Sequence, residues 1–124
     1  MKGKLLGLAM LPIVLALTAG SDSHYGSSGM GQLNVWAGGG SASAFAQTTA
    51  YSGIDVVTVE VSLTPSGSGC SGWVTASGEA RGYTSAQADQ PLGCNPTSAT
   101  GAAYHTITDD YGWPETFSTY ATAP

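Results

Sequence analysis

The chain has 124 residues and a formal charge of −5 at neutral pH. Two of its three basic residues, Lys2 and Lys4, lie near the N-terminus, so residues 21–124 hold one arginine, Arg81, against eight acidic side chains, a net charge of −7. So few cations cannot neutralise a row of phosphates or attach the chain to anionic lipid, which excludes nucleic-acid binding and polybasic membrane attachment. The length fits one domain.

The N-terminus has the pattern of a secretory signal peptide. A short basic segment (1–4) precedes an apolar run over residues 5–17, and the small residues that follow up to Gly20 suit cleavage before Ser21. The apolar run is too short for a membrane-spanning helix, which needs about 20 residues. We therefore predict a signal peptide over 1–20, a secreted, extracellular protein, and no stable membrane insertion after cleavage.

The next segment, residues 21–31, is rich in serine and glycine and is expected to form a flexible N-terminal arm. Residues 32–124 are predicted to form a single folded domain. Small residues and few aliphatic ones would fit disorder, but three tryptophans, six tyrosines and a low charge content favour a folded domain with a thin core.

Strands are predicted from alternation of apolar and polar residues. A first strand covers 33–37 and ends at the glycines 38–40. Residues 41–51 and 56–63 both alternate, and the valines of the second segment lie on one face. Because Ser52-Gly53 between them suits a tight turn, we predict a β-hairpin over 41–63.

The middle of the chain contains the only two cysteines, Cys70 and Cys94, which in an exported protein are expected to form one disulfide. A two-thiol metal site lacks neighbouring histidines, and no metal or cofactor is expected. Residues 73–84 form either one long strand or a hairpin that turns at 77–78. The hairpin is favoured because it brings the cysteines together more easily. Residues 85–98 are rich in turn formers and are predicted to be a loop.

The C-terminal part predicts a strand pair, 102–108 and 116–122, joined by residues 109–114. About seven short strands separated by turn signals result, and no helical periodicity follows the signal peptide. This pattern predicts an all-β protein, a small antiparallel β-sandwich that is immunoglobulin-like in general architecture, has one disulfide and is preceded by a signal-peptide helix.

Two groups of residues have the types found in catalytic or metal sites. His105 near Asp109 and Asp110 has the residue types of a base and its orienting carboxylate. Without an identifiable nucleophile, a strand histidine beside an aspartate-rich turn is preferred. The carboxylates of Asp109, Asp110 and Glu115 could hold Ca²⁺, but they lack its usual spacing, so a solvated hairpin end is preferred.

Paired carboxylates are the remaining catalytic possibility. Glu60 with Glu79 or Glu115 has the residue types of a glycoside hydrolase. A sheet with several acids brings such pairs together by chance, and a domain of this size leaves little material for a substrate cleft. We therefore predict that the protein is not an enzyme and has no catalytic residues.

Exposed aromatic side chains and the lone arginine are the preferred contact residues. Rings on the surface stack against sugars or anchor partner proteins, and an arginine beside a tyrosine on a disulfide-closed segment is typical of an anchor. The candidates for contact with a ligand or partner are Trp36, Arg81, Tyr83, Tyr111 and Trp113.

The sequence thus predicts a secreted, non-enzymatic binding or surface-structural module. Its partners are expected to be an extracellular protein, a glycan, or copies of itself. Self-association through sheet edges is included because the strands lack the lysines that discourage edge pairing. The alternative is a secreted proteinaceous inhibitor that presents the disulfide-closed loop around Arg81.

Overall fold

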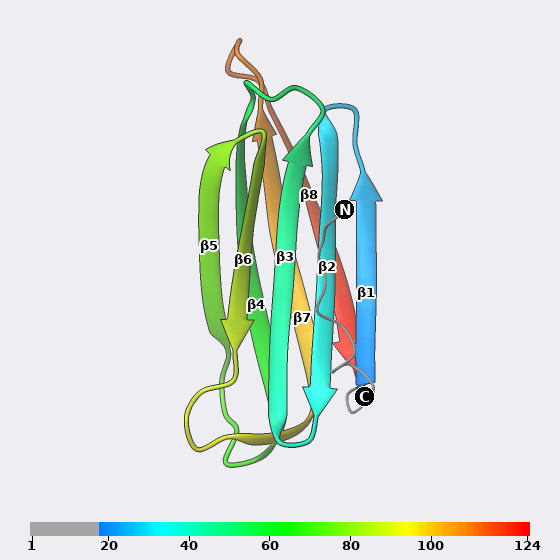
Figure 1. Ribbon diagram of the computed structural model, residues 1–124, viewed down its shortest axis with the longest axis vertical. Coiled ribbons are helices and arrows are strands. Elements are labelled where there is room, and N and C mark those ends of the chain that lie inside the picture. Colours follow the sequence, from blue (N-terminus) through cyan, green and yellow to red (C-terminus); the bar gives the residue numbers. More distant parts are fainter. Residues whose placement is uncertain (1–17) are drawn as a thin grey trace.

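The computed structural model describes residues 18–124, which form eight strands in two four-stranded antiparallel sheets (Figure 1). The predicted all-β sandwich is confirmed, with eight strands instead of about seven. The predicted signal-peptide helix falls on residues outside the described range. Within residues 18–124, no helix is long and apolar enough to cross a membrane.

The first sheet, sheet A, has the strand order β1-β2-β3-β6. The predicted strand at 33–37 lies inside β2, and a two-residue turn at Gly39 and Gly40 joins it to β3. Both glycines have positive φ angles, 62° and 81°, which favour residues without a Cβ. The strands of sheet A are β1 (Thr18–Tyr25), β2 (Gly29–Gly38), β3 (Ser41–Ala50) and β6 (Tyr83–Asp89).

The second sheet, sheet B, has the strand order β5-β4-β7-β8. The predicted C-terminal strand pair is confirmed: β7 and β8 are antiparallel neighbours, with Ala102 opposite Tyr120. The valines and Leu63 of the second predicted strand lie in β4 and point into the core. The strands of sheet B are β4 (Val56–Ser68), β5 (Val74–Arg81), β7 (Asn95–Thr108) and β8 (Pro114–Ala123).

The N-terminal segment differs from the flexible arm expected over 21–31. Residues 21–25 belong to β1 and residues 29–31 to β2, and only the short connection between them is irregular. β1 also includes residues 18–20, the last three of the predicted signal peptide. As an edge strand β1 is mostly exposed, so its small and polar side chains carry no apolar alternation from which to predict it.

The hairpin predicted over 41–63 is wrong in its pairing, although both strands exist. β3 pairs with β2 and β6 in sheet A, whereas β4 pairs with β5 and β7 in sheet B. Residues 51–55 cross from one sheet to the other. Each strand has one buried face, and alternation alone cannot tell whether two such strands lie side by side or face each other across the core.

Neither interpretation of residues 73–84 is correct. Ser77 and Gly78 lie inside β5, opposite Glu60 and Val59, and the chain reverses at Gly82 instead. The reversal carries the chain from sheet B to sheet A, so residues 70–94 form an arch. The loop predicted over 85–98 is also wrong, because it contains most of β6 and the start of β7.

The predicted disulfide is confirmed. Cys70 and Cys94 lie in the β4–β5 and β6–β7 connections, and their Cα atoms are 4.5 Å apart. Both connections lie at the end of the sandwich opposite Gly82 (Figure 1). The bond therefore closes the base of the arch and leaves its tip at the other end.

Small residues make up most of the core. Buried alanines pack in one cluster with Leu33, Val35, Val59, Val61 and Leu63. A Cβ added to Gly101 would lie 2.5 Å from Val35 Cγ2, so the sheets approach too closely there for any side chain. None of the nine tryptophan and tyrosine side chains is buried in this structure. The tryptophan and tyrosine rings therefore do not supply the core, although Phe117 belongs to it.

The lateral edges of the two sheets lie close to each other. On one side β1 runs along β8, and the backbone N–H of Tyr120 donates to Asp22 Oδ2 at 2.9 Å. On the other side β5 runs along β6, and a Cβ at Gly78 would lie 2.6 Å from the carbonyl oxygen of Ser85. Each edge strand is thus flanked by the edge of the other sheet.

Candidate functional site

Four connections meet at one end of the sandwich, shown at the top of Figure 1. They are the β1–β2 loop, the β3–β4 loop, the β5–β6 reversal and the β7–β8 loop. We call this surface the loop end and define it as residues 25–28, 51–55, 81–83 and 109–114. The antiparallel topology brings these four segments, far apart in the sequence, to one place.

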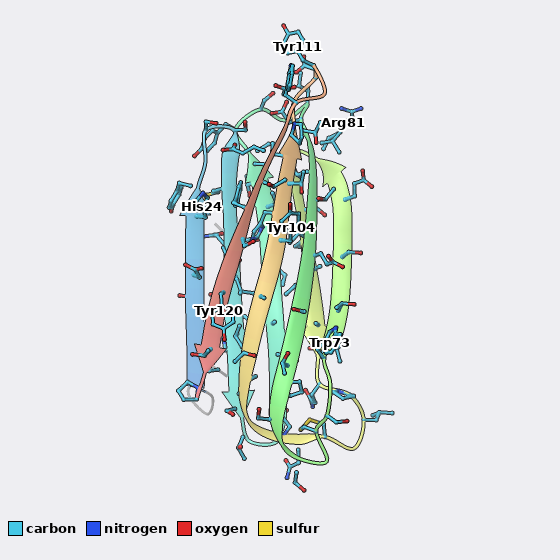
Figure 2. All side chains as sticks on the ribbon, turned by 180° about the vertical axis from the view of Figure 1, so that it is seen from behind. His24, Trp73, Arg81, Tyr104, Tyr111 and Tyr120 are labelled. Carbon is cyan, nitrogen blue, oxygen red and sulfur yellow. A yellow bond between two sulfur atoms is a disulfide. The ribbon has the colours of Figure 1, made fainter. Side chains whose placement is uncertain are left out.

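The loop end carries most of the large apolar side chains that are exposed in the described chain. Of ten such residues, six lie here, and Tyr111 and Trp113 are 85% and 72% exposed. A cluster of exposed apolar side chains with a polar rim marks an interaction site. Arg81, the only basic residue of the described chain, lies at the same end (Figure 2). The six are Tyr25, Tyr51, Ile54, Tyr83, Tyr111 and Trp113.

Hydrogen bonds tie the β1–β2 loop to both sheets. The Glu115 carboxylate, from β8, accepts the backbone N–H of Ser28 at 2.8 Å and that of Ser27 at 3.0 Å. The N–H of Tyr51, from the β3–β4 loop, donates to the carbonyl of Ser28 at 2.9 Å. The two backbone donors favour the ionised carboxylate and lower the pKa of Glu115.

The β5–β6 reversal is fixed to the β3–β4 loop. The Gly82 N–H donates to the Asp55 carbonyl, and the Gly82 carbonyl accepts the N–H of Ala50, both at 2.8 Å. Arg81 Nη1 donates to the Ile54 carbonyl at 2.7 Å. Gly82 has φ +79°, and a Cβ there would lie 3.1 Å from Gly53 Cα, so both conformation and space require glycine.

The β7–β8 loop is held by one aspartate. The Asp109 carboxylate accepts the N–H of Tyr111 at 2.9 Å and that of Trp113 at 3.0 Å. The Gly112 N–H donates to the Asp109 carbonyl at 3.0 Å, and Gly112 has φ +84°. The turn that presents the two most exposed rings of the loop end is thus defined by its own hydrogen bonds.

Two of the three candidate Ca²⁺ ligands hold the loops at this end. Asp109 and Glu115 direct oxygens at backbone N–H groups, as described above. No group of three His, Cys, Asp or Glu side chains that could hold a metal ion occurs among residues 18–124. The geometry therefore offers no support for a calcium site here.

The predicted contact residues separate into two places. Arg81, Tyr83, Tyr111 and Trp113 come together at the loop end. Trp36 lies near the far end of β2, half-buried on the outer face of sheet A, beside a depression of about 290 Å³. Tyr25 and Tyr51, in the first two loops, were not predicted as contact residues, although a tyrosine next to Ser or Gly at a strand end is a usable signal.

His105 is a core histidine, as preferred. It is fully buried between the two apolar clusters of the core, and its Nδ1 and Nε2 lie 2.8 Å and 2.9 Å from the hydroxyl oxygens of Thr48 and Thr119. Because the Thr48 hydroxyl donates to the Thr58 carbonyl, it accepts Nδ1–H, and Nε2 accepts from Thr119. Burial, with a smaller contribution from His24, lowers the pKa of His105 from 6.5 to about 4.

The three glutamates that were candidates for a catalytic pair do not form one site. Glu60 and Glu79 share the outer face of sheet B, in diagonal positions on β4 and β5. Glu115 lies at the loop end, hydrogen-bonded to the β1–β2 loop.

Comparison with protein-family models, with curated proteins and with solved structures gives no match.

Proposed function

We propose that the protein is a secreted, non-enzymatic module that binds an extracellular protein through its loop end. The observation that carries this proposal is the gathering of six exposed large apolar side chains and the lone arginine on four hydrogen-bonded loops. Secretion is supported by the leader-like N-terminal sequence and by the disulfide, which persists in oxidising compartments.

The composition of the loop end suits protein recognition. Tyrosine and tryptophan offer large contact areas with few rotatable bonds, and serine and glycine around them add hydrogen-bonding groups without bulk. Energetically important interface residues are enriched in Trp, Tyr and Arg. The loops are already held in place by backbone hydrogen bonds, so binding costs little additional conformational entropy.

Arg81 adds a directional contact. One of its guanidinium nitrogens donates to the Ile54 carbonyl, which fixes the side chain at the edge of the aromatic cluster. The remaining N–H donors are available for a carboxylate or carbonyl group of a partner. Among residues 18–124, which contain no lysine and no other arginine, this cation would set the orientation of the complex.

The inhibitor function remains the second candidate, because Arg81, Gly82 and Tyr83 form the tip of the arch that the disulfide closes at its base. Such a tip is rigid and exposed, as a segment that enters an enzyme's cleft must be. An inhibitor would use the same surface, with an enzyme as its partner. Loss of inhibition on Arg81→Ala, with folding intact, would distinguish it from a module that depends mainly on the rings of the β7–β8 loop.

Assembly through sheet edges is less well supported. Each edge strand is flanked by the edge of the opposite sheet, and Asp22 already accepts one outward N–H of β8. Light scattering coupled to size-exclusion chromatography over a hundredfold concentration range tests this. A constant monomer mass is expected, and a mass that rises with concentration would favour a self-assembling surface protein.

The binding proposal is tested with two tryptophans of matched exposure. The secreted chain is immobilised and screened against a panel of purified extracellular proteins and secreted enzymes. Trp113→Ser at the loop end is expected to weaken each specific interaction at least about tenfold. Trp73→Ser, which is 71% exposed at the opposite end, should leave it unchanged. Equal loss in both variants, or loss in neither, would contradict the proposal.

A further inference from the structure

The outer face of sheet B carries a depression of about 480 Å³ that is separate from the loop end. Because side chains alternate between the two faces of a strand, the side chains of β5, β4 and β7 that point to solvent here lie in two rows. One row runs from Glu79 through Thr58 to Thr106, and the next from Ser77 through Glu60 to Tyr104. The short Ser77 and Thr58 side chains leave space that the long glutamates and the tyrosine surround.

The polar groups of this depression have no partners within the described chain. The side chains of Glu60, Glu79 and Tyr104 form no hydrogen bond or ion pair with any residue of 18–124. The Tyr104 ring is half exposed, at 50%. An aromatic face and two free carboxylates thus border one concave area, with three hydroxyl groups between them.

A second ring extends the surface toward β8. Tyr120 is opposite Ala102 on β7, one row below Tyr104 and one strand across, so the two tyrosines are diagonal neighbours on the same face. Figure 2 looks onto this face and shows both tyrosines on adjacent strands. Ala102 lies beside both tyrosines, and its small side chain leaves the surface between the two rings free of projecting groups.

We propose that this depression is a glycan-binding site for neutral pyranose oligosaccharides. A pyranose ring has an apolar C–H face, which packs on an aromatic ring, and a rim of hydroxyl groups, which donate to carboxylates. Tyr104 provides the ring, and Glu60 and Glu79 provide acceptors on one side of it. Tyr120 offers a second ring to a neighbouring sugar unit.

The charge of the lining residues restricts which sugars can bind in the depression. The depression holds two carboxylates and no basic side chain among its lining residues, and the chain's single described arginine is engaged at the loop end. Uronic acids and sulfated or sialylated sugars would meet like charge at short range. The site therefore selects uncharged sugars against acidic ones.

The test uses the isotope-labelled secreted chain and three probes: maltohexaose, N-acetylchitohexaose and a heparin hexasaccharide, preceded by a glycan array. Titration to about 10 mM detects dissociation constants in the millimolar range. At least one neutral oligosaccharide, from the array or the pair named, is expected to shift the amides of Thr58, Ser77 and Glu79. The heparin fragment is expected to shift none of them.

Variants locate the binding. Tyr104→Ala is expected to weaken it about tenfold, Tyr104→Phe to preserve it, and Glu60→Gln to weaken it. Tyr111→Ala, at the loop end, should bind the sugar as the wild type does, which separates this site from the proposed protein-binding surface. The proposal is overturned if no neutral glycan binds, if acidic glycans bind equally well, or if Tyr104→Ala leaves the affinity unchanged.

Discussion

Lowering the pH from 6.5 to 4 is expected to remove about 3 kcal/mol of folding stability through His105 alone. The ring is buried and neutral in the folded chain, where its pKa is about 4, and exposed in the unfolded chain, where it is 6.5. Between these values only the unfolded chain binds the proton, so the free energy of unfolding falls as the pH falls. The contribution is complete above pH 6.5 and lost at pH 4.

Urea unfolding followed by tryptophan fluorescence at several pH values measures this effect. His105→Gln keeps hydrogen-bonding groups near Thr48 and Thr119 but does not titrate, so its stability should vary less between pH 6.5 and 4. His24→Gln, which removes the exposed histidine stacked on Phe117 and its smaller contribution to the lowered pKa of His105, should retain most of the wild-type dependence. The carboxylates contribute equally to all three proteins, so the difference between the slopes isolates His105.

Either of two results would contradict this role of His105 in acid sensitivity. A pKa of His105 close to 6.5 in the folded protein, measured by nuclear magnetic resonance titration, would mean that the ring is accessible to water. An unchanged pH slope in His105→Gln would mean that other groups control the acid sensitivity. Neither measurement requires knowledge of the protein's partner.

Three further outcomes are expected. Replacing Cys70 and Cys94 by serine should cost on the order of 3 kcal/mol, measured by urea unfolding, yet leave binding at the loop end intact because the disulfide closes the opposite end. Gly82→Val should cost about 1–3 kcal/mol in thermal unfolding, owing to the positive φ and the contact with Gly53; wild-type stability would disprove this. Glu115→Gln should lower the protection factors for amide exchange in the β1–β2 loop, taken relative to the intrinsic rate at each pH, and acid should do the same to the wild type as the pH falls through the lowered pKa of Glu115. Unaltered protection factors would contradict a role of the Glu115 carboxylate in holding this loop.

Strands with one apolar face were predictable from the sequence. Alternation located β2 and β4 because apolar residues such as Leu33, Val35 and Val59 recur on their inward faces. Runs of strand-forming residues on either side of a turn located the β7–β8 pair. The cysteine pair was also predictable from its number and context. In each case the physical signal lies within a few residues of the chain or in simple composition.

Pairing between strands was not predictable by the same means. β3 and β4 are consecutive and both amphipathic, and the short segment between them resembles a turn, yet it crosses between sheets. β1 and β6 are largely polar strands at the sheet edges, where burial imposes little pattern. The loop end depends on this topology. Its residues Arg81, Tyr83, Tyr111 and Trp113 were therefore predicted as separate contact residues, and Tyr25, Tyr51 and Ile54 were not predicted.

The thin core explains why the tryptophan and tyrosine rings lie on the surface. Alanines and close glycine contacts, such as Gly101 against Val35, leave the interior too narrow for tryptophan or tyrosine. Rings that contribute nothing to the core are replaceable without loss of the fold, and surface substitutions such as Tyr111→Ser or Trp113→Ser should change stability by no more than about 0.5 kcal/mol. We propose that side chains so large and so exposed serve contact with another molecule. A measured loss of more than about 2 kcal/mol in either variant, approaching the cost of truncating a buried ring, would instead make the loop end part of the structure's own stabilisation.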